Sequence, residues 1–458
     1  MSLHYVSRLS AIIVLVLLLP VKAFSNPDAP KSRIAKRDSI LKKINPPAIP
    51  AYSISIISFG AKGDSITNCK PAFDKALRIA KKRKGLKIVV PAGIYFVDGP
   101  LQLVSNVCIE LQKGARLKFS TNPASYLPVV STSWEGTFLY NYSPFIYGYQ
   151  LENISITGQG TIDGNASQTF NKWKDLQEKD QMLSRDMNHN NDAFKKRLFG
   201  KNHYLRPQLI QLFECKNILI EGVKIINSPF WCIHLLKSEN ATIRGISYDA
   251  KNLNNDGVDP EYSKNILIED VDFNNGDDNV AIKSGRDHEG RSTAIPSENI
   301  IIRNCRFKGL HGVVIGSEMS GGVRNVFIEN CTYGGYCKRG IYLKSNPDRG
   351  GFITNIYVNN VSFDKVEDCF FITSYYHGEG KGFATDIHNV FVDGLKCRQA
   401  TNAGLVVQGF PGKKVRDIYF SNVTIDSAPI GVSFTNTENI VMNDVTIGGE
   451  MKEPSAAK

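Results

Sequence analysis

The residues with the greatest capacity for chemistry are three aspartates, one histidine and one lysine in the second half of the chain. They are Asp256, Asp277, Asp278, His311 and Lys344. One carboxyl group can protonate a leaving oxygen, a second can activate water, and a cation can bind an acidic sugar. This combination of residue types indicates hydrolysis of a glycosidic bond next to a uronate.

The spacing of these residues links them to one another. Asp277 follows Asp256 by 21 residues, His311 follows Asp278 by 33, and Lys344 follows His311 by 33. Each interval is close to one turn of the repeat described below, and residues one turn apart lie above one another on the same face. Adjacent aspartates are often only solvated or capping residues, but this shared spacing predicts one catalytic patch.

A repeat of short β-branched segments must position this patch. The segments open at Asn106, Asn153, Asn217, Asn240, Asn265, Asn299, Asn325, Asn355, Asn389, Asp417 and Asn439. From Asn217 onward the intervals lie between 22 and 34 residues, with very little helix signal. Such a drifting period predicts an all-β fold, a single-stranded right-handed parallel β-helix whose turns stack into one elongated core. The asparagines are expected to form a ladder at the turns.

Two segments interrupt this pattern. Residues 70–84 place Phe73, Leu77 and Ala80 on one face at helical spacing, which predicts a short capping helix at the amino-terminal end of the solenoid. Residues 165–206 form a polar, partly helical insertion, and an insertion of this length usually has a function. We expect it to close one end of the substrate cleft.

The amino-terminal residues predict export. Residues 1–23 contain an apolar run from Ala11 to Leu19 and small residues near Ala23, as in a cleavable signal peptide. The run is too short to span a bilayer, so no stable membrane insertion is expected. Residues 24–50 are expected to be a flexible leader, and residues 51–458 the catalytic domain. The expected location is secreted or periplasmic.

Composition limits the possible partners. The chain carries a formal charge of +11, of which the first 43 residues contribute six, so the main body is only mildly basic. This balance suits an acidic polysaccharide and gives no indication of nucleic acid binding. The sequence contains no P-loop, no Ser-His-Asp pattern and no zinc-ligand spacing, and its nine cysteines are expected to be buried thiols. We expect no metal, no cofactor and a monomer.

Several motifs resemble glycoside hydrolase family 28, the polygalacturonases and related pectin hydrolases. The motifs are Phe59-Gly-Ala-Lys-Gly-Asp64, Val90-Pro-Ala-Gly-Ile-Tyr95, Asn227-Ser-Pro-Phe-Trp231, Asn255-Asp-Gly-Val-Asp259 and Gly276-Asp-Asp278. The resemblance implies a pectin-lyase-like solenoid. It also implies inverting hydrolysis with Asp277 as general acid and with Asp256 and Asp278 as the base pair. His311 and Lys344 match the family's histidine and lysine.

The resemblance also implies the residues that bind substrate. Lys344 stands in the family's Arg-Ile-Lys motif, but Tyr342 replaces the arginine. Arg339 or Arg349 could supply the missing charge, and the sequence leaves both possible. Asn255, Tyr342 and Tyr376 complete the candidate set, with Tyr376 expected on a cleft wall.

Together with this resemblance, the sequence predicts a secreted glycoside hydrolase that cleaves galacturonic-acid-containing pectin and acts from a chain end. An exo-polygalacturonase and a rhamnogalacturonan-type galacturonidase both fit, with a pectic polysaccharide or oligogalacturonide as substrate. Two alternatives remain, a pectate-type polysaccharide lyase and a β-helix that binds polysaccharide without cutting it. Three clustered aspartates favour hydrolysis, because a lyase would need an arginine or lysine as base.

Overall fold

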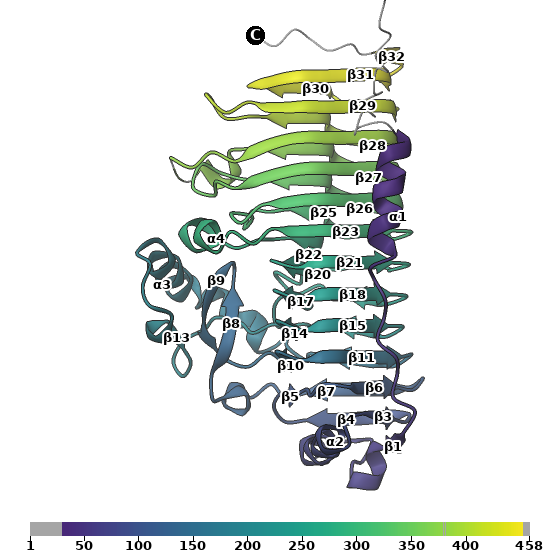
Figure 1. Cartoon of the computed structure of the whole chain (residues 1–458), viewed down its shortest axis with the longest axis vertical. Coiled ribbons are helices and arrows are strands. Elements are labelled where there is room, and N and C mark those ends of the chain that lie inside the picture. The colour runs from purple at the N-terminus through teal and green to yellow at the C-terminus, as the bar shows by residue number, and fades with distance from the viewer. Residues whose placement is uncertain (1–29, 379, 381, 452–458) are drawn as a thin grey trace, which may run out of the picture.

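The chain winds into a tall stack of parallel β-strands, as the repeat predicts. The computed structural model describes residues 30–378, 380 and 382–451. Successive coils rise along one axis from the capping helix at one end to the last strands at the other (Figure 1). The predicted parallel β-helix is confirmed.

Most strands belong to one sheet that continues from coil to coil, and they pair in parallel except for the last strand, β32, which pairs antiparallel with β31. Its strands are β1 (Ser53–Ser55), β3 (Leu86–Val90), β5 (Leu101–Gln102), β6 (Val107–Leu111), β10 (Ile146–Tyr149), β11 (Glu152–Gly158), β14 (Ile210–Phe213), β15 (Lys216–Glu221), β17 (Ile233–Leu236), β18 (Glu239–Arg244), β20 (Val258–Glu261), β21 (Lys264–Glu269), β22 (Asn275–Ile282), β23 (Ser297–Arg303), β24 (Arg306–Phe307), β25 (Gly309–Ile315), β26 (Val323–Lys344), β27 (Phe352–Thr373), β28 (Asp386–Gln408), β29 (Val415–Ile425), β30 (Ile430–Thr435), β31 (Thr437–Ile447) and β32 (Glu450–Met451). A second sheet stacks β2 (Asp64–Asn68), β4 (Gly93–Val97), β7 (Ala115–Phe119), β12 (Thr161–Asp163), β16 (Lys224–Ile226) and β19 (Ser247–Asp249).

The asparagine ladder is present at the turn where each repeat begins. Asn217 donates to Asn153 at 3.0 Å, and Asn240 donates to Asn217 at 2.6 Å. These asparagines have positive φ, near +57°, which asparagine tolerates better than other non-glycine residues. The same contact recurs farther up the stack, where Asn325 donates to Asn299 at 3.0 Å. The repeat in the sequence is therefore a hydrogen-bonded column along the fold.

The interior of the coils is apolar and closely stacked. One internal column runs through five aromatic rings, with centroids of successive rings 4.3–5.1 Å apart. These rings are Tyr248, Phe273, Phe307, Tyr333 and Phe363. All nine cysteines are buried and unpaired, as expected. Burial of one ring on the next fixes the register of the coils from inside, while the ladder fixes it at the turns.

The amino-terminal end of the stack is closed by helix α2 (Lys70–Arg83). Its residues Phe73, Leu77 and Ala80 are buried against the first coils. The basic residues Lys81, Lys82 and Arg83 form its last turn, where their positive charges interact favourably with the negative end of the helix dipole. The predicted capping helix is confirmed. Among the residues that the structure describes, no helix is long and apolar enough to cross a membrane.

Two excursions leave the coils on the same side (Figure 1). The predicted insertion contains η3 (Phe170–Asp175), α3 (Glu178–His189), η4 (Phe194–Lys196) and β13 (Leu198–Phe199). The second excursion, which the repeat did not reveal, is an antiparallel hairpin of β8 (Val130–Trp134) and β9 (Thr137–Asn141). β13 pairs with β9, so the insertion and the hairpin form one small sheet. Helix α4 (Asp287–Thr293) lies beside α3.

Within the stretch expected to be a flexible leader, the structure places helix α1 (Pro30–Leu41) along the flank of the coils (Figure 1). The other residues of the predicted signal peptide and leader before position 30 lie outside the described residues. Ile40 and Ile44 pack on an outer row of side chains that crosses several coils. Arg37 also donates to Glu329 at 3.1 Å. The helix escaped the sequence analysis because it contains few apolar residues and its partners lie hundreds of residues away.

We expect Ile40→Ala to lower the free energy of unfolding by about 2 kcal/mol, because it leaves a void under α1. The matched control is Ile34→Ala on the same helix, where the isoleucine is half exposed. Thermal unfolding of both variants gives the comparison, and kcat should be unchanged in each. Equal effects of the two substitutions would show that α1 does not depend on this contact.

Candidate active site

The coils bring together the five residues that the spacing selected. Asp256 precedes β20, Asp277 and Asp278 lie in β22, His311 lies in β25, and Lys344 ends β26. The backbone amide of Gly257 donates to the carbonyl of Asp278 at 2.9 Å, which places Asp256 beside the aspartate pair.

The pairing of residues between adjacent coils differs in one respect from the pairing that the sequence intervals predicted. Asp278 pairs with His311, as expected, but His311 pairs with Arg339 and not with Lys344. The prediction for Lys344 was wrong in register because turns of different length separate the coils. Lys344 instead reaches Asp278 with its long side chain.

Asp278 is a buried carboxylate with two donors. His311 Nδ1 lies 2.7 Å from its Oδ1, and Lys344 Nζ donates to its Oδ2 at 3.0 Å. Burial alone would raise the pKa of Asp278, but Lys344 and His311 outweigh it and hold this pKa well below its ordinary value. Asp278 therefore stays ionised at any pH near neutrality.

Asp277 has the opposite electrostatic character. Burial raises its pKa above the ordinary value, and the neighbouring charge of Asp278 raises it further. Its side chain keeps 24% exposure, whereas that of Asp278 keeps 2%. Asp277 is therefore the carboxyl group that can both hold a proton and meet a ligand.

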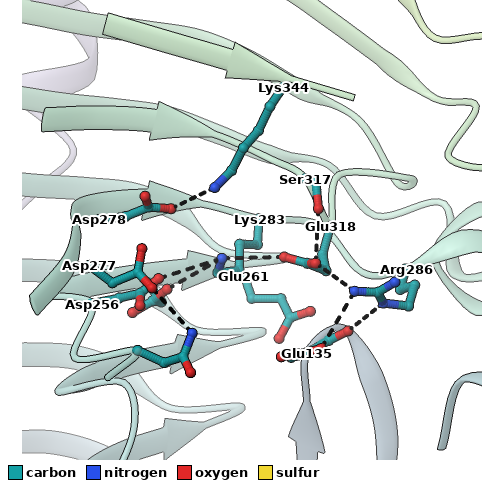
Figure 2. Close-up of polar contacts among 12 residues, drawn as sticks. Glu135, Asp256, Glu261, Asp277, Asp278, Lys283, Arg286, Ser317, Glu318 and Lys344 are labelled. Carbon is teal, nitrogen blue, oxygen red and sulfur yellow. Dashed lines mark hydrogen bonds and ion pairs between the residues drawn. The ribbon is translucent and has the colours of Figure 1, made fainter. Parts of the chain in front are cut away.

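Asp256 lies against a second buried lysine. Lys283 Nζ is 3.8 Å from Asp256 Oδ2 and 3.7 Å from Asp259 Oδ1. Burial raises the pKa of Asp256 well above its ordinary value, and the adjacent Asp259 acts in the same direction. Figure 2 shows Asp256, Asp277 and Asp278 grouped together, with Lys283 beside them and Lys344 directed at Asp278. Lys283 therefore lies between the Asp256–Asp259 pair and Glu318, all within 3.8 Å of its Nζ.

The same lysine connects the aspartates to a second charged cluster. Glu318 lies 3.3 Å from Lys283 Nζ and accepts from Arg286 Nη2 at 2.8 Å (Figure 2). Burial would raise the pKa of Glu318, but Lys283 and Arg286 hold it well below the ordinary value. Arg286 also approaches Glu135, at the tip of the β8–β9 hairpin, at 3.6 Å. Alternating charges thus run from the coils to the hairpin.

These groups surround a polar pocket of about 190 Å³. That volume is below the range of pockets for drug-sized ligands and suits a unit as small as one sugar. The coils contribute Trp231, Asn254, Asp256, Asp277, Asp278, Lys283, Arg286, Ser317, Glu318, Lys344, Arg349, Tyr376 and His377, and the excursions contribute Glu135, Lys174, Gln181 and Arg185. The insertion is therefore part of the pocket wall.

The residues expected to bind substrate divide into two groups. Lys344 and Tyr376 line the pocket, and Tyr376 forms its wall as predicted. Tyr342 and Arg339 do not line it. Tyr342 is buried, with the guanidinium of Arg339 4.9 Å from its ring centre, and Arg339 pairs with Asp368 at 3.2 Å. These two residues lie in the same strand as Lys344 and contact the patch through His311, which pairs with Arg339 and whose ring centroid is 5.7 Å from that of Tyr342.

Asn255 does not occupy the expected place. Its side chain has no exposed surface and donates to the carbonyls of Ser228 and Phe230 at 2.9 and 3.0 Å. The preceding residue, Asn254, lines the pocket instead. The prediction for Asn255 was wrong because the turn before β20 directs the second asparagine inward.

Arg349 lines the pocket, but its guanidinium already has partners. Its Nε donates to the Ser317 carbonyl at 2.8 Å, and its Nη1 contacts Asp287. Of the two arginines left open by the sequence, Arg349 is thus nearer to the pocket and Arg339 is nearer to Tyr342.

The sequence analysis missed the acidic and insertion residues of the pocket. Glu318 could have been found from the sequence, because it lies in a polar, glycine-rich segment directly after β25. This segment is one coil above the segment that follows Lys283, since β22 pairs with β25. Glu135, Gln181 and Arg185 could not have been found, because they come from segments outside the repeat. Gln181 Nε2 donates to Glu135 at 2.8 Å, and Arg185 Nη2 donates to it at 3.3 Å.

One spacing at the site could also suit a metal ion. Ligand-type atoms of Asp277, Asp278 and His311 all lie within 4.8 Å of one another. Both oxygens of Asp278 already have a nitrogen partner, however, in His311 and Lys344. Both oxygens of Asp278 are therefore already hydrogen-bonded within the protein.

Comparisons with known proteins agree with this geometry. The family model described as "Glycosyl hydrolases family 28" matches residues 82–447. The crystal structure of a hyperthermoactive exopolygalacturonase from Thermotoga maritima is similar, with a TM-score of 0.88 and 37% identity, covering 91% of this chain and 96% of that one. A "Probable polygalacturonase" from Vitis vinifera is 29% identical, over 93% of this chain and 84% of its own length. An "Endo-polygalacturonase" from Pectobacterium carotovorum is 29% identical, over 80% of this chain and 86% of its own length.

Proposed function

The chain belongs to glycosyl hydrolases family 28, and from this membership we propose that it removes galacturonate from the ends of pectic chains by inverting hydrolysis. The observation that carries the proposal is that the pKa values of two adjacent carboxyl groups are shifted in opposite directions. The pKa of Asp277 is raised by burial and by Asp278, whereas Lys344 and His311 hold that of Asp278 low. Such a pair supplies an acid and a base at the same pH.

Each residue then has a role in the reaction. Asp277 protonates the glycosidic oxygen as the bond breaks. Asp278 accepts a proton from the attacking water, which enters on the opposite face of the sugar. Asp256 Oδ1 is buried and has no hydrogen-bond partner among the described residues, so it can orient that water. His311 and Lys344 keep Asp278 ionised.

The products distinguish this reaction from the alternatives. Incubation with polygalacturonate should release reducing ends without an increase in ultraviolet absorbance, since only a lyase forms an unsaturated uronide. Proton NMR of the first product should show the inverted anomer before mutarotation. Unsaturated products, a retained anomer, or binding without cleavage would each contradict the proposal.

The pocket wall supports action from a chain end. A groove lined only by coils would be open along the stack, but here α3 is fastened to the hairpin through Gln181, Arg185 and Glu135. Lys174 and Arg185 add positive charge to that wall, where the carboxylate of a terminal uronate could bind. The similarity to an exopolygalacturonase at 37% identity is consistent with this.

We expect Arg185→Ala to raise KM for oligogalacturonides about 10- to 100-fold, because a charge-assisted hydrogen bond contributes roughly 1.5–3 kcal/mol. Loosening of the wall should also let di- and trigalacturonate appear among the early products, where the wild type releases monomer. The control is Lys179→Ala, which removes an exposed cation from the same helix. A broad ladder of products from the wild type itself would contradict end-acting cleavage.

Other parts of the proposal concern the polymer, the location and the assembly. The enzyme is proposed to be exported through residues 1–23 and to act as a monomer on pectic polysaccharide or oligogalacturonides. The family's arginine is absent at position 342, where a buried tyrosine lies outside the pocket lining. Loss of this bidentate partner for a carboxylate favours rhamnose-linked or otherwise decorated galacturonan. Comparison of kcat/KM on polygalacturonate and on rhamnogalacturonan tests this preference.

A further inference from the structure

Arg206 is a fully buried arginine that no step of the proposed reaction uses. It ends the insertion, and its relative exposure is 0%. Its Nε donates to Gln177 Oε1 at 2.9 Å, and its Nη1 donates to the Leu253 carbonyl at 2.7 Å. Burial lowers its pKa to about 10, against the attraction of nearby carboxylates. The guanidinium is therefore charged at neutral pH and bonded on several sides.

A third contact of Arg206 leads to the catalytic aspartates. Its Nη2 donates to Asn254 Oδ1 at 2.5 Å, and Asn254 Nδ2 donates to Asp277 Oδ2 at 3.2 Å. A guanidinium has donors but no acceptor, so the amide atom that faces it must be the oxygen. The amide nitrogen is then the atom directed at Asp277. Arg206 thus determines the orientation of the Asn254 amide.

We propose that Arg206 is a positioning residue which, through Asn254, determines the oxygen of Asp277 that carries the catalytic proton. This inference rests on the proposed role of Asp277 as general acid. Because Asn254 donates to Oδ2, the proton of Asp277 is favoured on Oδ1. A reversed amide would present its oxygen to Asp277 and draw the proton to Oδ2 instead.

The same contact affects the pKa of Asp277. A hydrogen bond donated to a carboxylate stabilises its ionised form and lowers its pKa. Loss of the Asn254 amide should therefore raise the pKa of Asp277 beyond the increase that burial already causes. The alkaline limb of the activity profile, where Asp277 loses its proton, should move to higher pH while turnover falls.

The test compares two variants of this relay with two matched controls. Asn254→Gly removes the amide and suits the backbone, because Asn254 has φ +55°. Arg206→Lys keeps the charge but not the planar donor set. Asn252→Ala removes an amide that donates to the Ser228 carbonyl at 2.9 Å in the same turn. Arg197→Lys alters another buried arginine of the insertion, which binds Glu289.

For Asn254→Gly we expect kcat to fall about 10- to 100-fold with KM within about two-fold of wild type, since the carboxylate that forms as Asp277 gives up its proton loses a hydrogen bond. The alkaline limb should move to higher pH. Arg206→Lys should shift the limb in the same direction with a smaller loss of kcat, and the controls should leave it in place. An unmoved limb in either relay variant, or an equal shift in the controls, would overturn the proposal.

A second measurement separates this inference from the proposed function. In protein labelled with ¹³C at the aspartate carboxyl carbons, the signal that disappears in Asp277→Asn reports the titration of Asp277. The inference predicts that this titration moves to higher pH in Asn254→Gly, even if no galacturonide proves to be a substrate. An unchanged titration would overturn it whatever the activity, while absence of hydrolysis with a shifted titration would overturn only the proposed function.

Discussion

Replacement of Asp277 by Asn should lower kcat on polygalacturonate by roughly 10²–10⁴-fold, the contribution usual for a general acid. Asn cannot release a proton to the leaving oxygen, although it fills the same space. KM should change little, because Asp277 is one of many groups lining the pocket. Thermal stability at neutral pH should be equal or higher, because ionisation of Asp277 is disfavoured in the folded state. Retention of more than a tenth of the turnover would remove Asp277 from the mechanism.

A change of leaving group makes this prediction specific to acid catalysis. An aryl galacturonide with an acidic phenol needs little protonation as its bond breaks, so Asp277→Asn should lose much less activity on it than on polygalacturonate. Asp278→Asn should lose activity equally on both substrates, because activation of water does not depend on the leaving group. If both variants respond in the same way, the roles of acid and base are not divided between these two residues.

The architecture was predictable from the sequence because it is repetitive. Each segment that opens with Asn or Asp became a strand of one parallel sheet, and positive φ at the asparagines explains why this residue recurs. The predicted capping helix also had a clear signal in Phe73, Leu77 and Ala80. In both cases a local pattern was sufficient, since the neighbouring coil supplies the same contacts each time.

The active site was predictable only in part, because register depends on turn lengths. Asp278 and His311 were placed correctly in adjacent coils, but the equal interval to Lys344 was coincidental. The direction of side chains within a turn could not be predicted from the sequence either. Asn254, rather than the predicted Asn255, therefore lines the pocket.

The excursions could not be predicted for a different reason. The β8–β9 hairpin and α3 meet through Glu135 and Arg185, which are 50 residues apart and follow no period. Their apolar contacts come from Trp134, Phe199 and Phe230 in a cluster separate from the interior of the coils. Segments of this kind depend on tertiary contacts that only the folded chain shows, and here they complete the pocket.

Lys344 connects the electrostatics of the site to its pH dependence. The proposed mechanism requires a protonated Asp277 and an ionised Asp278, so the profile should be bell-shaped. Its acid limb should lie below the ordinary pKa of aspartate, where Asp278 gains a proton, and its alkaline limb above that value, where Asp277 loses one. Lys344 lowers the pKa of both groups, and it touches Asp278 directly.

Lys344→Met should therefore move both limbs to higher pH, the acid limb more than the alkaline one. It should also lower kcat/KM on the order of 10²–10³-fold, as loss of a single electrostatic partner does in other active sites. The control is Lys396→Met, which removes an exposed lysine from β28. Rate profiles across pH, measured with both variants and the wild type, give the comparison. A lower rate with unmoved limbs would mean that Lys344 binds substrate without controlling Asp278, and that another group keeps the base ionised.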